Sequence, residues 1–367
     1  MRPKPATQGI GFKHKERTLN FRLTLFGVFA VALLTAGTAH ATHYRYGAIS
    51  WQTEDGATFD FTIQNAWRRS AYTTSNGRCI NPADLSSVAC SGADGMAIAG
   101  DIIAEFQGLS TFDPGDGSAL VGSGLGPLLY LVTSHDADDD WVFGFALDPS
   151  SLPAVDTEIT HGYTGGAVTA ALDSCCRTSR FSGINEHLNN PDGAYRIETL
   201  VDVGGTNSAS PTSTMPQIQS CNVDSLCNFL VPGADDEAVS FRLSTSAEAA
   251  NSRFGTLGVF NQPGTVAAPN PASIDSVTGL YEWDTTGATL ATAGNNTLYS
   301  TQITIEDSTS KSAVDFFIQL VDDPTAPPVI TPPPDSPPIC HTTQVATVGG
   351  AKTFDVTGSD PDSDDTV

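Results

Sequence analysis

Two stretches near the C-terminal end of the chain alternate apolar and polar residues with a period of two. In residues 299–306, one side of the alternation holds Tyr299, Thr301, Ile303 and Ile305, and the other holds Ser300, Gln302, Thr304 and Glu306. Residues 314–320 repeat the pattern after a polar turn at 307–311. Successive side chains of a strand point to opposite faces, so the pattern predicts an antiparallel hairpin with one buried face and one face in water.

The rest of the chain favours the same kind of structure. Gly, Ser, Thr, Asp and Pro are abundant, and no long segment repeats apolar residues at the helical period. An Asp55-Gly56 pair between alternating segments predicts a hairpin over residues 48–63. Residues 157–177 predict a second hairpin, with a strand on either side of Gly165-Gly166. The predicted fold class is therefore all-β.

The first 41 residues have the pattern of an export signal. Six basic residues precede or border an apolar run that begins at Leu23, and Ala39-His40-Ala41 is a small-x-small cleavage pattern. The apolar run is shorter than the roughly 20 residues that a membrane-spanning helix needs. We expect cleavage after Ala41, a secreted or cell-surface location, and no integral membrane span in the exported chain.

The exported chain is strongly acidic. Six of the 17 Lys+Arg residues and one of the 41 Asp+Glu residues lie in the signal, which leaves 11 basic and 40 acidic residues and a net charge of −29. Such a surface repels nucleic acid and anionic membranes. It favours solubility and the binding of cations.

Export makes disulfide bonds the expected state of the cysteines. Cys79 with Cys90 and Cys221 with Cys227 are the natural local pairs. Cys175 and Cys176 are adjacent, so we expect each to reach a different partner, or one of them to be free. Cys340 is the odd cysteine. No C-x2-C spacing for zinc occurs.

Two motifs resemble the polycystic-kidney-disease-type (PKD) domain. Residues 112–118, Phe-Asp-Pro-Gly-Asp-Gly-Ser, are similar to the aromatic-Asp-aromatic-Gly-Asp-Gly turn of that family, with Pro114 in place of the aromatic. His161-Gly162-Tyr163 and the apolar residues that follow resemble its closing hairpin. The resemblance implies an immunoglobulin-like β-sandwich over about residues 95–180. A tyrosine at such a place can bond back to the backbone and fix a sandwich corner.

Three further groups of residues resemble exported β-rich surface proteins that are largely uncharacterised and start with His-x-Arg-x-Gly. They are residues 43–47 (His-Tyr-Arg-Tyr-Gly) with Trp51, residues 175–177 (Cys-Cys-Arg), and residues 278–283 (Thr-Gly-Leu-Tyr-Glu-Trp). The end of the second half is similar to the last hairpin of cadherin-like modules. Together these resemblances imply tandem immunoglobulin-like β-sandwiches, PKD-like and then cadherin-like.

The predicted organisation has five parts. The signal spans residues 1–41, and an N-terminal β-rich region that includes the PKD-like sandwich spans 42–200. A cadherin-like sandwich spans 201–323. Residues 324–338 hold eight prolines, which predicts an extended linker. Residues 339–367 read as the start of a third, truncated immunoglobulin-like module, so we expect the natural chain to continue.

Clustered carboxylates suggest calcium, which takes six to eight oxygen ligands. The candidate ligands lie in three acidic clusters: Asp136, Asp138 and Asp140; Asp235 and Asp236; and Asp360, Asp362 and Asp364. None of the clusters fits an EF-hand loop, and aspartate is also a common turn residue that bonds its own backbone. Both readings stay open at this point.

No catalytic motif is present: the sequence has no G-x-S-x-G, no H-E-x-x-H and no P-loop. We therefore predict a non-enzymatic interaction or adhesion module that binds an extracellular protein or glycan, with calcium as a stiffening ion. The alternative is a carbohydrate-binding module that belongs to a larger secreted hydrolase. Its candidate stacking residues are Trp51, Trp67, Trp141 and Trp283, although each lies in or beside a strand pattern, which favours core packing.

Overall fold

The computed structural model describes residues 43–105, 110–250, 259–266 and 269–322, and the backbone of residues 329–331 and 357–359. Nearly all regular structure in these ranges is β, which confirms the predicted class. The predicted signal, most of the linker and third module, and Cys340, Asp360, Asp362 and Asp364 lie outside the described residues. Residues 329–331, inside the predicted linker, are a strand that pairs with residues 357–359.

The strands and helices have the following bounds: β1 (Tyr44–Thr53), β2 (Thr58–Arg68), η1 (Arg69–Ala71), η2 (Thr74–Asn76), β3 (Cys79–Ile80), β4 (Ser87–Val88), β5 (Ile102–Ala104), β6 (Thr111–Asp113), β7 (Leu129–Asp136), β8 (Trp141–Ala146), β9 (Glu158–Gly162), β10 (Val168–Cys175), β11 (Phe181–Ser182), β12 (Asn185–His187), β13 (Ala194–Val201), β14 (Ile218–Asn222), β15 (Leu226–Leu230), β16 (Ser240–Leu243), α2 (Ser246–Ala250), β17 (Ser273–Ile274), β18 (Leu280–Asp284), β19 (Asn296–Glu306), β20 (Lys311–Val321), β21 (Val329–Thr331) and β22 (Thr357–Ser359).

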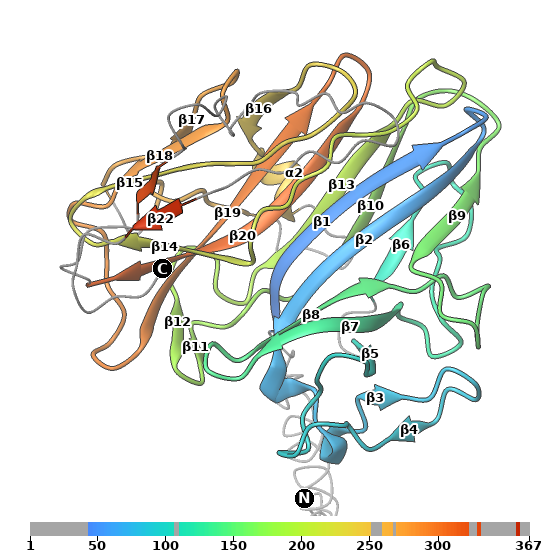
Figure 1. Cartoon of the computed structure of the whole chain (residues 1–367), viewed down its shortest axis with the longest axis horizontal. Coiled ribbons are helices and arrows are strands. Elements are labelled where there is room, and N and C mark those ends of the chain that lie inside the picture. Colours follow the sequence, from blue (N-terminus) through green and yellow to red (C-terminus); the bar gives the residue numbers. More distant parts are fainter. Residues whose placement is uncertain are drawn as a thin grey trace, which may run out of the picture. The chain divides into compact units, whose positions relative to one another are not determined.

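The first hairpin forms as predicted. β1 and β2 pair antiparallel over their whole length, and both lie at the front of the view in Figure 1. Asp55 Oδ1 accepts the backbone N–H groups of Ala57 and Thr58 at 2.8 and 2.6 Å, which forms the turn. Gly56 takes a φ of +67°, a conformation that glycine adopts without strain.

β1 contributes side chains to two separate hydrophobic cores. Ile49 and Trp51 belong to the first core, whereas Tyr46 and Ala48 belong to the second. The two sets alternate along the strand, as the period of two requires. A register shift between Tyr44 and Tyr46 places Tyr44 in the first core despite its parity with Tyr46. β1 therefore lies between the two cores and contributes one face to each.

The first core is enclosed as in a β-sandwich. β10 and β13 pair with each other and lie behind β1 and β2 in Figure 1. Leu172 and Ile197 from the back sheet meet Phe59, Phe61 and Trp67 from the front sheet in this core. β2 also pairs with β8 and β9, and β8 pairs with β7.

The predicted hairpin over residues 157–177 is wrong, although both of its strands exist. β9 pairs with β2 in the front sheet, and β10 pairs with β13 and β6 in the back sheet. The Gly165-Gly166 segment therefore crosses from one sheet to the other. The local pattern could show the strands but not their partners.

The two PKD-like motifs meet across this crossing. Tyr163 Oη donates a buried hydrogen bond of 2.9 Å to the Pro114 carbonyl. His161 Nε2 lies 3.0 Å from Asp116 Oδ2. This is the expected tyrosine bond that fixes a sandwich corner; the PKD subtype itself stays a prediction.

The second core is built around the hairpin of β19 and β20, which forms as predicted. The expectation that this hairpin has a polar face in water is wrong. Ser300, Gln302 and Thr304 are as buried as their apolar neighbours. They are buried because other segments cover them and provide hydrogen bonds, for example Gln302 Nε2 to the Arg196 carbonyl at 2.7 Å.

Strands from both sides of the predicted 200/201 boundary pair with one another. β20 pairs with β1 and with β13, and β12 pairs with β19. The described residues from 43 to 322 belong to one compact unit. The predicted N-terminal region and the predicted second sandwich therefore share sheets, and the residue boundaries of the domains stay a prediction.

A buried ion pair lies where the two halves meet. Arg177, which follows β10, donates to both carboxylate oxygens of Asp315 on β20, at 2.7 and 2.5 Å. Both side chains are inaccessible to water. Gln302 Nε2 donates to the same carboxylate at 2.8 Å, and the Phe260 ring lies 4.6 Å from the guanidinium carbon.

Arg177→Met is expected to lower the free energy of unfolding by about 3–5 kcal/mol, because it leaves the Asp315 carboxylate buried without its counter-charge. The double variant Arg177→Met/Asp315→Leu removes both charges and is expected to lose less than the single variant. Urea unfolding of the three proteins measures the difference. A double variant that is less stable than Arg177→Met would show that the unpaired charge is not the cause.

Candidate functional site

The first predicted acidic cluster lies in the turn between β7 and β8. Asp136 Oδ1 accepts the N–H groups of Asp138 and Asp139, both at 2.8 Å. The Asp140 carboxylate accepts the N–H and the hydroxyl of Ser70 at 2.7 and 2.8 Å. Two of the three predicted ligands therefore form the turn and anchor a loop. The structure does not bring the carboxylates of Asp136, Asp138 and Asp140 together in one cluster.

The second predicted cluster gains a member that the sequence did not reveal. Burial, the contact with Asp236 and the charge of Asp307 raise the pKa of Asp235 to about 7. Asp307 is held by Asn207 Nδ2 at 2.8 Å and by the backbone N–H of Thr309 at 2.6 Å. In the described part of the chain, no Lys, Arg or His nitrogen lies within 4.0 Å of these three carboxylates.

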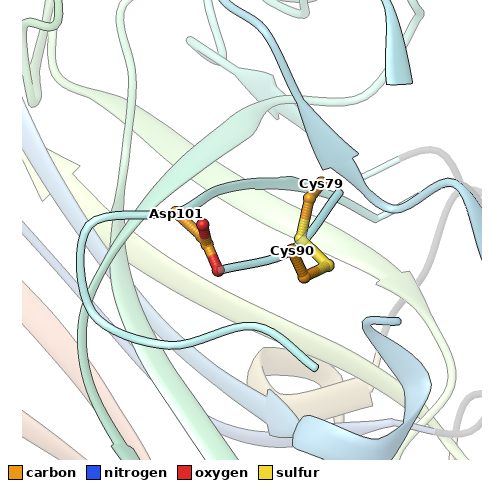
Figure 2. A group of neighbouring side chains, drawn as sticks. All are labelled: Cys79, Cys90 and Asp101. Atoms are coloured by element: carbon orange, nitrogen blue, oxygen red, sulfur yellow. A yellow bond between two sulfur atoms is a disulfide. The ribbon is translucent and has the colours of Figure 1, made fainter. Parts of the chain in front are cut away.

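A third group, which the sequence pattern did not suggest as a metal site, has the spacing of one. Cys79, Cys90 and Asp101 offer ligand atoms within 4.8 Å of one another, and Figure 2 shows the three side chains converging. The two sulfurs form a disulfide, so neither is a thiolate that could bind a metal. Asp101 accepts Ser91 Oγ at 2.6 Å and Ile98 N–H at 3.0 Å. The group is therefore the rigid base of a loop.

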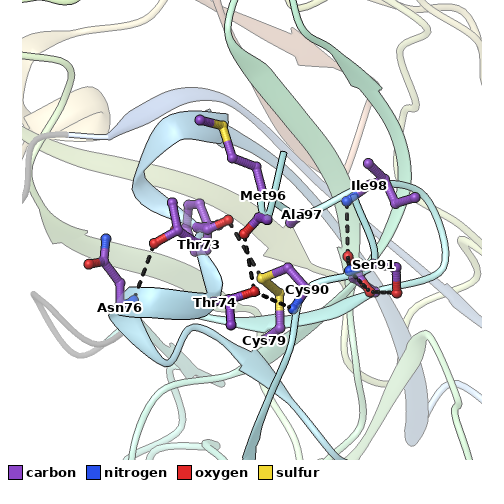
Figure 3. Close-up of a disulfide and its surroundings, with 12 residues drawn as sticks. Thr73, Thr74, Asn76, Cys79, Cys90, Ser91, Met96, Ala97 and Ile98 are labelled. Carbon is purple, nitrogen blue, oxygen red and sulfur yellow. Dashed lines mark hydrogen bonds between the residues drawn. A yellow bond between two sulfur atoms is a disulfide. The ribbon is translucent and has the colours of Figure 1, made fainter. Parts of the chain in front are cut away.

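The loop around this disulfide contains the predicted local pair, Cys79 and Cys90. Cys90 N–H donates to Thr74 Oγ1 at 2.9 Å, as drawn in Figure 3. Arg69 donates to both oxygens of Asp94 at 2.7 and 2.9 Å, and Arg69 Nε donates to the Ala97 carbonyl at 2.8 Å. The disulfide and these bonds fix the loop against η1.

The other cysteines confirm one prediction and correct another. Cys221 and Cys227 are bonded, as expected. Cys175 and Cys176 are bonded to each other, so the expectation of different partners or a free thiol is wrong. The remaining described cysteines, Cys79, Cys90, Cys221 and Cys227, form the two local pairs.

One serine and one histidine make the contact that nucleophilic catalysis requires, but they are sealed in the interior. His187 Nε2 lies 3.0 Å from Ser300 Oγ, and His187 Nδ1 lies 2.9 Å from the Thr178 carbonyl. Neither side chain is exposed, and burial lowers the pKa of His187 to about 3. The contact therefore joins β12 to β19 and has no access to a substrate.

Only one of the four tryptophans reaches the surface. Trp51, Trp67 and Trp283 are buried in the two cores. Trp141 is half-buried at the start of β8, and Phe143 and Phe145 follow it at every second position with similar burial. Arg68 on β2 lies directly opposite Trp141.

Beside Trp141 lies an exposed apolar hairpin that the sequence analysis missed. Phe181 is 61% exposed and Ile184 is 48% exposed, on either side of the turn that joins β11 to β12. Arg68 Nη1, at the end of β2, donates to Ser182 Oγ at 2.6 Å, which holds the hairpin against β2 where β2 pairs with the start of β8. In the sequence, the two apolar residues Phe181 and Ile184 flank the turn dipeptide Ser182-Gly183, and this pattern could have indicated an exposed apolar hairpin. We call Arg68, Trp141, Phe181 and Ile184 the β8–β11 surface.

The fold and its disulfides define an all-β, sandwich-type protein, with the exposed Phe181 and the half-buried Trp141 on the β8–β11 surface. Residues 45–204 match the family described as "Integrin beta-like protein A-E, N-terminal". In the described residues, no helix has the length and apolar character that crossing a membrane requires.

Two curated proteins of Dictyostelium discoideum are similar over most of the chain. Integrin beta-like protein C is 28% identical over 307 residues, and Integrin beta-like protein A is 28% identical over 324 residues. These alignments cover 82% and 83% of this chain, and 13% of each relative. The chain thus corresponds to a small part of those proteins.

Among solved structures, the two tandem V-type regions of VCBP3, a v-region-containing chitin binding protein, show a remote likeness. The sequences are 10% identical, and the match covers 61% of this chain and 94% of the other at a TM-score of 0.25. We base no inference on it.

Asp235→Asn is expected to remove a pH dependence of stability. Because the fold favours the protonated carboxyl, the contribution of Asp235 is complete below about pH 4 and is lost as the pH rises through about 7. The wild type should therefore lose about 1 kcal/mol relative to Asp235→Asn between about pH 5 and pH 8, after allowance for solvent screening. Thermal unfolding of both proteins at the two pH values measures this difference, and an unchanged gap would contradict the raised pKa.

Proposed function

We propose that this chain is an exported, non-enzymatic adhesion module of the cell surface, and that it binds a protein partner through the β8–β11 surface. The observation that carries the proposal is where the β8–β11 surface lies in the sequence. All four residues of this surface fall within residues 45–204, the segment that matches the N-terminal region of integrin beta-like proteins. The printed names of the relatives support an adhesive role, and the export signal and the disulfides support a location outside the cytosol.

The chemistry of the surface supports the same role. Aromatic residues and arginine are enriched at the energetic centres of protein interfaces. Phe181 and Ile184 are exposed, and the Arg180 guanidinium carbon lies 5.7 Å from the centre of the Phe181 ring. Arg180 also contacts Glu186 at 2.8 Å, which holds its side chain beside the ring. These residues are therefore presented on a fixed hairpin.

Phe181→Asp/Ile184→Asp is expected to weaken adhesion by about 2 kcal/mol or more, because it replaces the apolar anchors with charge. The measurement is the attachment of cells of the producing organism to surfaces coated with the full chain. Val277→Asp is the matched control, since Val277 is 79% exposed and lies outside residues 45–204. Equal attachment to the wild type and the double variant would reject the β8–β11 surface.

A carbohydrate-binding module, alone or within a larger secreted hydrolase, is the second candidate. The observation that favours it is Trp141, whose ring is partly open to solvent beside Arg68 while the other three tryptophans are buried. A sugar can stack on such a ring. Binding of the chain to a glycan array that is lost in Trp141→Ala, with cell attachment unchanged in Phe181→Asp/Ile184→Asp, would favour this candidate over protein adhesion.

We propose that calcium stiffens the module at Asp235, Asp236 and Asp307. Burial is the largest cause of the raised pKa of Asp235, and the contact with Asp236 and the charge of Asp307 add to it. A divalent cation would offset the repulsion among these carboxylates. Calcium should raise the melting temperature at about pH 8 with an apparent Kd of about 10⁻⁴–10⁻³ M, typical of extracellular modules. Asp235→Asn should reduce the shift, and a melting temperature that is the same in calcium and in EDTA would reject the site.

A further inference from the structure

β15 is an edge strand in the described structure. It pairs with β18 along one side, and β18 pairs with β17 on its other side. Apart from the ladder to β18, no hydrogen bond of the described residues reaches the backbone of residues 226–230. An open edge presents unpaired N–H and C=O groups, and these can pair with a strand from another chain.

β15 lacks the features that usually protect an edge. Natural edge strands carry charges, prolines or bulges, or are very short. β15 is five residues long, Leu-Cys-Asn-Phe-Leu, and has no charged residue and no proline. Among the other strands that pair along one side, β16 contains Arg242 and β9 contains Glu158 and His161, whereas β14 is uncharged but polar, with Gln219, Ser220 and Asn222. β15 differs from all three in having exposed leucines at both ends.

The outer face of β15 is apolar at both ends. Leu226 is 56% exposed and Leu230 is 40% exposed, with the exposed Asn228 between them. The inner residues Cys227 and Phe229 face the second core, and the Phe229 ring stacks on Tyr281 at 4.8 Å. The two exposed leucines are thus on the side of the strand that its own fold does not cover.

The sequence of β15 is complementary to itself. When two copies pair antiparallel about Asn228, Leu226 of one copy lies opposite Leu230 of the other, and this happens twice. Opposite residues of an antiparallel pair share a face, so the four leucines come together on the outer face. Asn228 lies opposite its own copy, where two amides can hydrogen-bond.

We propose that β15 is the two-fold interface of a homodimer, in which β15 of each copy pairs antiparallel with β15 of the other, centred on Asn228. The pairing continues the β17–β18–β15 sheet into the second copy and forms a closed, two-fold symmetric contact. Within each copy, Glu282 and Asp284 on β18 lie opposite Asn228 and Leu226, and Asp224 precedes the strand. β15 itself carries no charge, so the two β15 strands place no like charges directly opposite each other. The dimer does not depend on the adhesive role, because the β8–β11 surface uses other strands.

The test uses charges at the two-fold centre. Sedimentation equilibrium of the full chain should show a reversible monomer–dimer equilibrium. Asn228→Lys alone and Asn228→Asp alone should each weaken self-association by about tenfold or more, because like charges then lie directly opposite each other. An equimolar mixture of the two variants should restore dimers, because it places Lys opposite Asp.

Val277→Lys is the control for general surface stickiness, since it charges an exposed valine that is not on β15. It should dimerise like the wild type. Circular dichroism and the melting temperature confirm that the Asn228 variants fold, which the exposure of Asn228 leads us to expect. A wild type that stays monomeric, an Asn228→Lys variant that dimerises like the wild type, or a mixture that does not associate would each overturn the proposal.

Discussion

The buried pair of Arg177 and Asp315 is the constraint that joins the two cores. Asp315 lies opposite Gly47 in the pairing of β20 with β1, so the carboxylate sits where the central hairpin meets the second core. Arg177 reaches it from the end of β10, in the back sheet of the first core. Either charge alone in this interior would be expensive, so the fold requires both strands in place together. The pair therefore specifies how the halves fit.

The sequence pattern predicted several strands correctly but did not predict which strands pair. Alternation identified β1, β2, β19 and β20, because the period of a strand is a local property. It could not identify partners, and so it joined β9 to β10 when each belongs to a different sheet. It also read Ser300 and Gln302 as solvent-facing. Polar side chains on a strand show only that hydrogen-bond partners exist, and here the partners include distant residues such as Asn190 and Arg196.

The candidate sites also differ in whether they depend on local or long-range contacts, and only the local ones could be predicted from the sequence. Cys79–Cys90 and Cys221–Cys227 could be predicted, because short separations keep such cysteines close in any fold. Asp307 could not be joined to Asp235, because 71 residues separate Glu237 from Ser308, whose side chains bond across the same turn. The β8–β11 surface was missed because exposure of Phe181 depends on what the rest of the chain leaves uncovered.

The central strands of the described structure are largely covered by other segments. β19 buries both of its faces, and β1 and β2 are covered over most of their length, so the central strands have little surface to offer a partner. Exposed apolar side chains lie on the β11–β12 hairpin, on the edge strand β15 and at scattered loop positions such as Val277. Phe181 and Leu226 belong to neither core, so replacing either one should cost the fold little, within about 0.5 kcal/mol. Binding by this protein can therefore be separated from its folding, because the residues proposed for binding are not those that hold the structure together.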